Sequence, residues 1–179
     1  MGKKGSTGKF LLIISVFLAY FSVLSYFLLD SIGAWWIVEF NPILGANQTS
    51  YLNAFGYFGQ TGEELQIVLG NLGIFGAVLL LVGPLLTLLS ILKESKIFAF
   101  LGFFLMVSAL GIFLYGLVSV EDFESVLAGL SFLTGDEFMV FFGTTDLGIF
   151  GIWTWMLGVG FYMAVIATLL TLIGAIILN

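Results

Sequence analysis

The sequence contains no cysteine, no histidine and no arginine among its 179 residues, and it has only two prolines. Without cysteine, the chain forms no disulfide and offers no thiol nucleophile or redox-active thiol pair. Without histidine, it lacks the side chain that most often serves as a general base, and a common haem ligand. These absences exclude thiol-dependent oxidoreductases. We expect a protein that is not an enzyme, with no catalytic residues and no cofactor.

Charge is also scarce. Only 9% of the residues are charged, whereas soluble domains carry about a quarter. Four charge-free runs cover residues 10–29, 67–92, 97–120 and 147–178. Each run reaches the roughly 20 residues that a helix needs to cross a hydrocarbon core about 30 Å thick. We therefore predict an all-α membrane protein, in which residues 1–179 form a single four-transmembrane-helix bundle surrounded by the lipid bilayer.

The few charges are distributed unevenly. All five cations are lysines, and they fall before the first run and between the second and third: Lys3, Lys4, Lys9, Lys93 and Lys96. Ten of the eleven acidic residues lie in or beside the other two loops, and only Glu94 accompanies lysines. Lysine and arginine in short loops favour the cytoplasmic side. We predict a multi-pass protein of the cell membrane with cytoplasmic termini and with extracellular loops at residues 30–61 and 119–134.

The chain also shows an internal similarity. Residues 61–70 match residues 134–143 class by class, and the pentapeptide Leu-Gly-Ile-Phe-Gly at 72–76 recurs at 147–151. Polar and glycine positions are in register, which is uncommon among unrelated apolar segments. We predict two tandem parallel-repeat helical hairpins with a small extracellular cap. The predicted repeats span residues 9–92 and 96–178.

Two capping boxes predict where the second helix of each repeat begins. Thr61 with Glu64, and Thr134 with Glu137, have the spacing at which a threonine oxygen accepts an N–H and the glutamate reaches back. In the second repeat, the polar residues 144–146 predict a bulge, or a break with a new cap at Thr145.

The conformation of the outer loops is less clear from the sequence. The aromatic stretch 51–58 in the first loop is compatible with a short strand or with an interfacial turn, and the sequence does not choose between them. After Ser119, apolar residues at helical spacing predict a short amphipathic helix at the outer interface.

Two carboxylate pairs are the only candidate metal ligands: Glu63 with Glu64, and Asp136 with Glu137. Hard cations such as calcium take several oxygen ligands. However, the capping role already explains one acid of each pair, and adjacent side chains on a helix point about 100° apart. We therefore predict no metal site.

Asn47 begins an N-glycosylation sequon, Asn47-Gln48-Thr49, in the first outer loop. Because that loop is predicted to be extracellular, Asn47 is a candidate for glycosylation.

Tryptophans and small residues have predicted structural roles. Trp35, Trp36, Trp153 and Trp155 are expected to form a belt at the outer membrane interface. Small residues are expected to let helices pack closely, within the bundle or between subunits. These are Gly70, Gly73, Gly76, Gly148, Gly151, Gly160 and Ala164. Pro84 is expected to kink the second span.

The order of inside termini, a longer first outer loop, a tight inner turn and a shorter second outer loop resembles the claudin-type tetraspans. The resemblance is one of topology. The family's Gly-Leu-Trp motif followed by two cysteines is missing here, so no functional residue is carried over.

We expect a non-catalytic membrane scaffold or assembly subunit that packs laterally, as a homo-oligomer or with other membrane subunits. Nucleic acid is not an expected partner of its acidic outer face. One alternative is an oligomeric cation channel, in which the outer acids attract cations. Another is an accessory subunit of a respiratory membrane complex.

Overall fold

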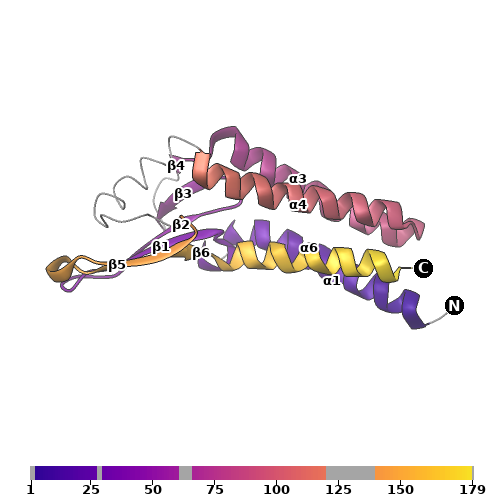
Figure 1. Cartoon of the computed structure of the whole chain (residues 1–179), viewed down its shortest axis with the longest axis horizontal. Coiled ribbons are helices and arrows are strands. Elements are labelled where there is room, and N and C mark those ends of the chain that lie inside the picture. The colour runs from indigo at the N-terminus through magenta and orange to yellow at the C-terminus, as the bar shows by residue number, and fades with distance from the viewer. Residues whose placement is uncertain (1–2, 28–29, 61–65, 120–139, 179) are drawn as a thin grey trace.

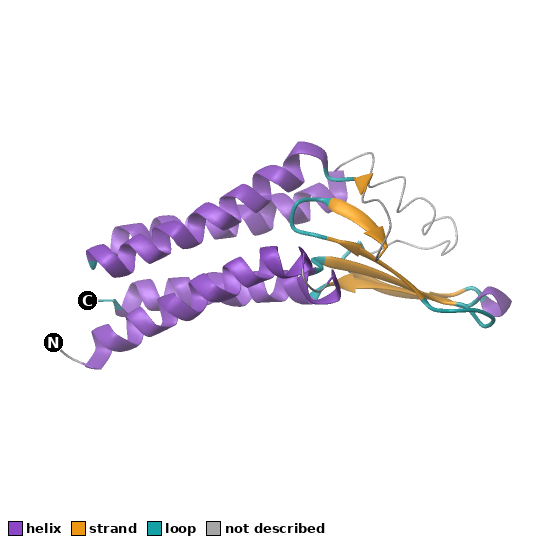
Figure 2. Ribbon diagram, turned by 180° about the vertical axis from the view of Figure 1, so that it is seen from behind, coloured by secondary structure: helices purple, strands orange, loops and turns teal. Residues whose placement is uncertain are grey.

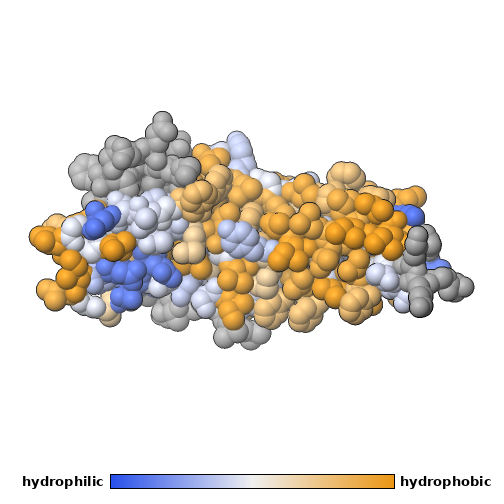
Figure 3. All heavy atoms as spheres, turned by 60° about the horizontal axis from the view of Figure 1, so that its bottom comes forward, coloured by the Kyte–Doolittle hydropathy of each residue, from blue (hydrophilic) through white to orange (hydrophobic). Residues whose placement is uncertain are grey.

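The structure, a computed structural model, describes residues 3–27, 30–60, 66–119 and 140–178. These residues form two parts arranged end to end (Figures 1 and 2). Four long helices make up one part, and an antiparallel sheet extends from one end of them. On the face shown in Figure 3, apolar side chains cover the helices and polar side chains gather on the sheet.

Four of the helices are long and apolar enough to cross a membrane, with mean hydropathies between 2.2 and 2.6. The helices are α1 (Lys3–Leu24), followed by a 3-10 turn at Ser25–Phe27, the short α2 (Asp30–Gly33), α3 (Gly70–Lys93), α4 (Lys96–Ser119) and α6 (Val159–Ile177). The candidate spans are Ser6–Phe27 and the whole of α3, α4 and α6. The prediction of four apolar spans is therefore confirmed by the length and composition of these helices.

Both termini and the α3–α4 turn lie at the end of the helices that is farther from the sheet (Figure 1). Glu94 makes this turn by adopting a left-handed backbone, with φ of 53°, and its N–H donates to the carbonyl of Ser90. The Lys9 ammonium lies 2.5 Å from the Glu94 carboxylate, so an ion pair links α1 to the turn. Which end faces the cytoplasm stays a prediction from the lysine distribution.

Six strands form one antiparallel sheet in the order β4-β3-β2-β1-β6-β5. The strands are β1 (Trp36–Asn41), β2 (Gln48–Leu52), β3 (Tyr57–Gln60), β4 (Gln66–Ile67), β5 (Phe142–Asp146) and β6 (Ile152–Leu157). The prediction of an all-α protein is therefore wrong. Of the two conformations left open for residues 51–58, the strand is the one observed over parts of this stretch.

The fourth apolar run is only partly helical. Residues 147–178 are free of charge, yet helix α6 begins at Val159 and the preceding residues form β6. β6 is rich in aromatic and β-branched side chains, which fit a pleated surface, and it pairs along its whole length with β1. An apolar run does not by itself distinguish a buried strand from a helix. The pairing with β1 decides in favour of the strand.

The two copies of Leu-Gly-Ile-Phe-Gly have different structures. Residues 72–76 lie in α3, whereas residues 147–151 form the turn between β5 and β6. One pentapeptide sequence therefore lies within a helix at 72–76 and forms a turn at 147–151, where two paired strands flank it. The structure therefore does not support the predicted repeat in this register.

The second helix of each predicted repeat begins later than the capping boxes imply. α3 starts at Gly70 and α6 at Val159, and neither has a side-chain cap. The capping residues themselves, and the amphipathic helix expected after Ser119, lie outside the described residues. At the polar residues 144–146 the chain forms β5 instead of the predicted bulge or cap.

The helices pack as two tight pairs, α3 with α4 and α1 with α6 (Figure 1). Glycines allow the backbones of each pair to lie close together. A Cβ built on Gly102 of α4 would lie 2.6 Å from the Gly83 carbonyl oxygen of α3, and one on Gly174 of α6 would lie 3.2 Å from the Gly8 carbonyl oxygen of α1. Small residues let helix backbones come close enough for van der Waals packing to stabilise the pair.

Buried hydroxyl groups hydrogen-bond inside the bundle. The Ser15 hydroxyl on α1 contacts the Thr171 hydroxyl on α6, and it also donates to the Ala167 carbonyl at 2.7 Å. Thr87 donates to the Gly83 carbonyl at 3.1 Å, next to Pro84, which lacks an N–H. α3 continues through Pro84, and the kink expected there stays a prediction.

The glycine contact predicts a sensitive position in the α3/α4 pair. Gly102→Ala places a methyl group 2.5 Å from Thr87 Oγ1 and 2.6 Å from backbone, so the helices must separate. We expect a loss of about 1–3 kcal/mol in the free energy of unfolding, as in other overpacked interiors. Gly111→Ala on the same helix is the control, because a Cβ there meets nothing within 4 Å. Equal stabilities of the two variants in denaturant unfolding would contradict this packing.

The ion pair predicts a dependence of stability on pH. The Lys9 ammonium donates a hydrogen bond to the Glu94 carboxylate and attracts it, which holds the pKa of Glu94 below its ordinary value. The stabilisation is present above the pKa of the unfolded chain, and it is lost as the pH falls through the lowered pKa of the folded state. Glu94→Gln should remove this acid-side change in melting temperature, with little effect at neutral pH because the pair is partly exposed. Lys9→Gln should remove it equally, and an unchanged profile in both variants would show that the pair contributes nothing.

Candidate functional site

The helices and the sheet are joined at residues 34–36. The Trp35 N–H donates to the Leu52 carbonyl of β2 at 2.7 Å, and the Gly158 N–H donates to the Trp35 carbonyl at 2.9 Å. The Gly160 N–H of α6 donates to the Ala34 carbonyl at 2.9 Å. One short segment thus holds the end of α1, strand β2 and the start of α6 in a fixed relation.

The Trp35 ring fills the space between this junction and the helices. Its side chain is 1% exposed and meets Phe113 of α4 edge-on at 4.8 Å and Phe161 of α6 at 5.7 Å between ring centroids. Its indole N–H donates to the Ser22 carbonyl at 3.0 Å. Because the ring contacts three of the four long helices and satisfies its polar atom, it anchors the sheet to the bundle.

Protein encloses three of the four tryptophans of the predicted interfacial belt, Trp35, Trp36 and Trp155, and the belt itself stays a prediction. A belt requires rings at the boundary between membrane and water. Trp36 and Trp155 are 0% and 4% exposed, so protein encloses them as it encloses Trp35. Trp153 is partly exposed and stacks on Phe40, with 4.8 Å between ring centroids.

One face of the sheet carries the tryptophans of β1 and β6, and the other face carries both polar and apolar side chains. Val38 of β1 lies opposite Trp155 of β6, and Trp155 lies opposite Gly143 of β5, where an added Cβ would collide with the indole ring. On the other face, Glu39 lies opposite Thr154, and Thr154 lies opposite Thr144. The two threonine hydroxyls are 3.3 Å apart. Phe142, Met156 and Ile152 share this second face, and all three are exposed.

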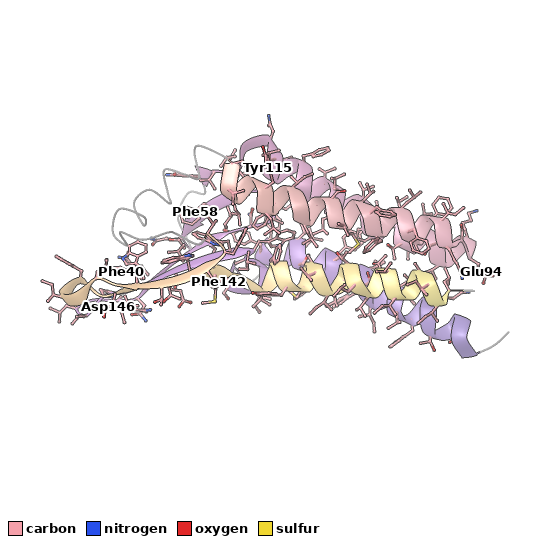
Figure 4. All side chains as sticks on the ribbon, in the orientation of Figure 1. Phe40, Phe58, Glu94, Tyr115, Phe142 and Asp146 are labelled. Carbon is pink, nitrogen blue, oxygen red and sulfur yellow. The ribbon has the colours of Figure 1, made fainter. Side chains whose placement is uncertain are left out.

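The outer end of the sheet carries exposed apolar side chains, which we call the tip. It comprises Ile43 and Leu44 from the β1–β2 turn and Ile149 and Phe150 from the β5–β6 turn, with exposures of 65%, 91%, 83% and 68%. The two turns are neighbours because Asn41 of β1 pairs with Ile152 of β6. Asp146, near the tip, and Glu94 lie at opposite ends of the molecule (Figure 4).

β5 is the open edge of the sheet. Among the described residues it pairs with β6 on one side and with no strand on the other. Its Phe142, Thr144 and Asp146 side chains are exposed and alternate with partly buried ones. An edge strand presents a row of backbone N–H and carbonyl groups that suits pairing with another strand.

The four acids weighed as candidate metal ligands are not placed. Glu63, Glu64, Asp136 and Glu137 lie outside the described residues. Within the described ranges, no three or more histidine, cysteine, aspartate or glutamate side chains come together as a metal site would require.

Most of the predicted packing residues have contacts within the chain. Gly73 faces the backbone of Phe55 and Gly56, and Gly76 faces Ala109 of α4. Gly160 approaches Gly33, and Ala164 is fully buried.

The other predicted glycines serve the backbone. Gly70, Gly148 and Gly151 have positive φ angles of 52°, 61° and 125°, which glycine adopts at least cost. Asn47 is exposed in the β1–β2 turn, and its glycosylation stays a prediction.

Sequence reasoning missed the tip and the β5 edge. Their signals are visible in retrospect. Pro42 and Gly45 occur in one turn, Asp146 and Gly148 in the other, and aromatic and other side chains alternate in β6 directly after the second turn. Turn residues between alternating runs predict a hairpin. The charge-free run concealed this pattern, because it was long enough to be a span.

Comparison of the sequence with protein-family models and with curated proteins gives no match.

The contact of Trp155 with Gly143 predicts a second sensitive glycine. Gly143→Ala drives a methyl group into a buried ring that has little room to move. We expect a loss of about 1–3 kcal/mol in the free energy of unfolding and a change in tryptophan fluorescence. Thr144→Ala, next in the strand and on the opposite face from Trp155, should leave both nearly unchanged. A Gly143→Ala protein with native stability and fluorescence would refute the buried position of Trp155.

Proposed function

We propose that the chain is a non-catalytic, multi-pass membrane scaffold whose copies assemble side by side through the edges of their sheets. The observation that carries the proposal is the open edge at β5 together with the direction of β4 at the other edge. Five antiparallel steps separate these strands, so they run in opposite directions.

Copies in one membrane share one orientation. β1, β5 and β6 extend along the long axis of the helices (Figures 1 and 2). When two like-oriented copies stand side by side, β5 of one is therefore antiparallel to β4 of the next. The pairing continues the alternation within each sheet, and antiparallel pairing supplies partners for the edge backbone groups. β5 against β5 would be parallel, which breaks this alternation.

The width of the sheet is compatible with this arrangement. Neighbouring strands lie about 4.8 Å apart, so six strands advance roughly 29 Å per copy. Two helices side by side measure about 20–24 Å, since each is about 10–12 Å wide with its side chains. The helical parts thus fit within the repeat distance that the sheets set.

We also propose an orientation in the cell membrane. The sheet lies outside the cell, and the termini and the α3–α4 turn lie in the cytoplasm. The five lysines near these cytoplasmic ends support this orientation.

Cysteine cross-linking tests the assembly directly, because the chain has no cysteine of its own. Ile67 of β4 and Thr144 of β5 are exposed and share one face of the sheet through the pairing register. Ile67→Cys and Thr144→Cys copies mixed in one membrane should cross-link with a short bismaleimide. Thr144→Cys alone should cross-link several-fold less, since β5 meets β4 and not another β5.

Charge substitutions provide a matched control. Thr144→Lys combined with Ile67→Lys places like charges on the same face of the two edges that meet between copies, and it should reduce the oligomer several-fold in native membranes. Thr144→Lys combined with Ile67→Glu should restore the oligomer, because the pair is then attractive. Both positions are exposed, so the fold of each copy is unaffected. A chain that stays monomeric in the membrane, or oligomers indifferent to these charges, would refute edge-to-edge assembly.

A further inference from the structure

The tip lies too far from the helices to meet the membrane that they span. β1 and β6 each contain six residues, which at about 3.3 Å per residue carry the tip roughly 20 Å beyond the junction with the helices. The four tip side chains nevertheless have exposures between 65% and 91%. Such an exposed apolar cluster on an ordered hairpin marks a binding surface.

Part of the backbone of the β5–β6 turn is hydrogen-bonded within the turn. The Leu147 N–H donates to the Gly151 carbonyl at 2.9 Å, and the Gly151 N–H donates to the Gly148 carbonyl at 3.3 Å. The Phe150 N–H donates to the Leu147 carbonyl at 3.4 Å, and the Gly148 N–H donates to Asp146 Oδ1 at 2.8 Å. Each of these bonds lowers the cost of moving the turn out of water, because an unpaired backbone group in an apolar environment costs free energy.

The shape and size of the tip favour lipid over protein as its partner. A stable protein interface takes about 20–30 residues from each side. The tip offers four large apolar side chains on two narrow turns, and a second tip would add only four more. A bilayer needs no complementary shape, because its acyl chains adapt to whatever enters.

We propose that the tip inserts into the facing leaflet of a second, apposed bilayer. Ile43, Leu44, Ile149 and Phe150 enter the region between headgroups and acyl chains, and Asp146 stays among the headgroups. Apolar burial drives the binding. Since the described tip residues carry no cation, anionic lipid does not strengthen it. The inference goes beyond lateral assembly and does not depend on it.

Fluorescence of a single label tests insertion. Full-length protein in nanodiscs carries an environment-sensitive fluorophore on Leu44→Cys, and protein-free phosphatidylcholine vesicles are added. The emission should shift to the blue and rise in intensity. A label on Thr144→Cys, farther from the tip along β5, should show no shift. Absence of a shift at Leu44 overturns the proposal.

Flotation with the same vesicles identifies the side chains responsible. Ile149→Ser combined with Phe150→Ser should lower the recovery of nanodiscs with vesicles by roughly tenfold or more. Phe142→Ser is the matched control, because Phe142 is a phenylalanine of similar exposure, 58%, at the other end of β5. It should leave recovery unchanged. Recovery should also be insensitive to salt and to added phosphatidylserine.

Two outcomes would overturn lipid insertion. Loaded nanodiscs that join each other through the tip but ignore protein-free vesicles would make a second copy the partner. Recovery that depends on anionic lipid, or that survives the tip substitutions, would place binding elsewhere. The Thr144→Lys and Ile67→Lys substitutions should leave flotation intact, so failure of lateral assembly and failure of insertion are distinguishable.

Discussion

The position of the whole sheet depends on the buried hydrogen bonds and rings around residues 34–36. The Trp35 and Ala34 backbones bind β2 and the start of α6, and the Trp35 ring lies against α4 and α6. Bulky neighbours would not fit there, because Gly158 and Gly160 approach these carbonyl groups closely. The sheet is therefore held as a rigid extension of the helices, and every surface on it has a defined place relative to them.

Because the sheet is held rigidly, the two proposed binding surfaces have fixed positions relative to the helices. The edge strands β4 and β5 lie on the flanks of the sheet, where the proposed neighbours in the same membrane would pair with them. The tip lies at the far end, where the proposed second bilayer would receive it. A protein that extends sideways through its edges and outward through its tip would hold two membranes at a set distance. The two contacts use different chemistry, backbone hydrogen bonds in one and apolar side chains in the other.

The helices support the sheet, and their polar side chains point mostly into the bundle. Gly83 with Gly102, and Gly8 with Gly174, bring the helices into two tight pairs, and buried hydroxyls such as Ser15 and Thr171 bond inside them. Large apolar side chains, such as those of Phe17 and Phe104, remain exposed on the outside. In a hydrocarbon solvent such a bundle is stabilised by close packing and internal hydrogen bonds.

The sequence by itself determined the four spans, because about twenty uncharged residues have only one favourable arrangement in lipid. It also set the lysines apart from most of the acids, which is the basis of the predicted orientation. Only the tertiary structure decided that residues 147–157 form a hairpin and not the start of a helix, since β6 is a strand only when β1 lies beside it. The copy of Leu-Gly-Ile-Phe-Gly at 72–76 is not flanked by two paired strands, and it lies within helix α3. The burial of Trp36 and Trp155 and the meeting of the two turns at the tip follow from the pairing of β1 with β6. It joins residues more than a hundred positions apart, so it leaves no local signal, whereas the β5–β6 hairpin has local turn signals that the charge-free run concealed.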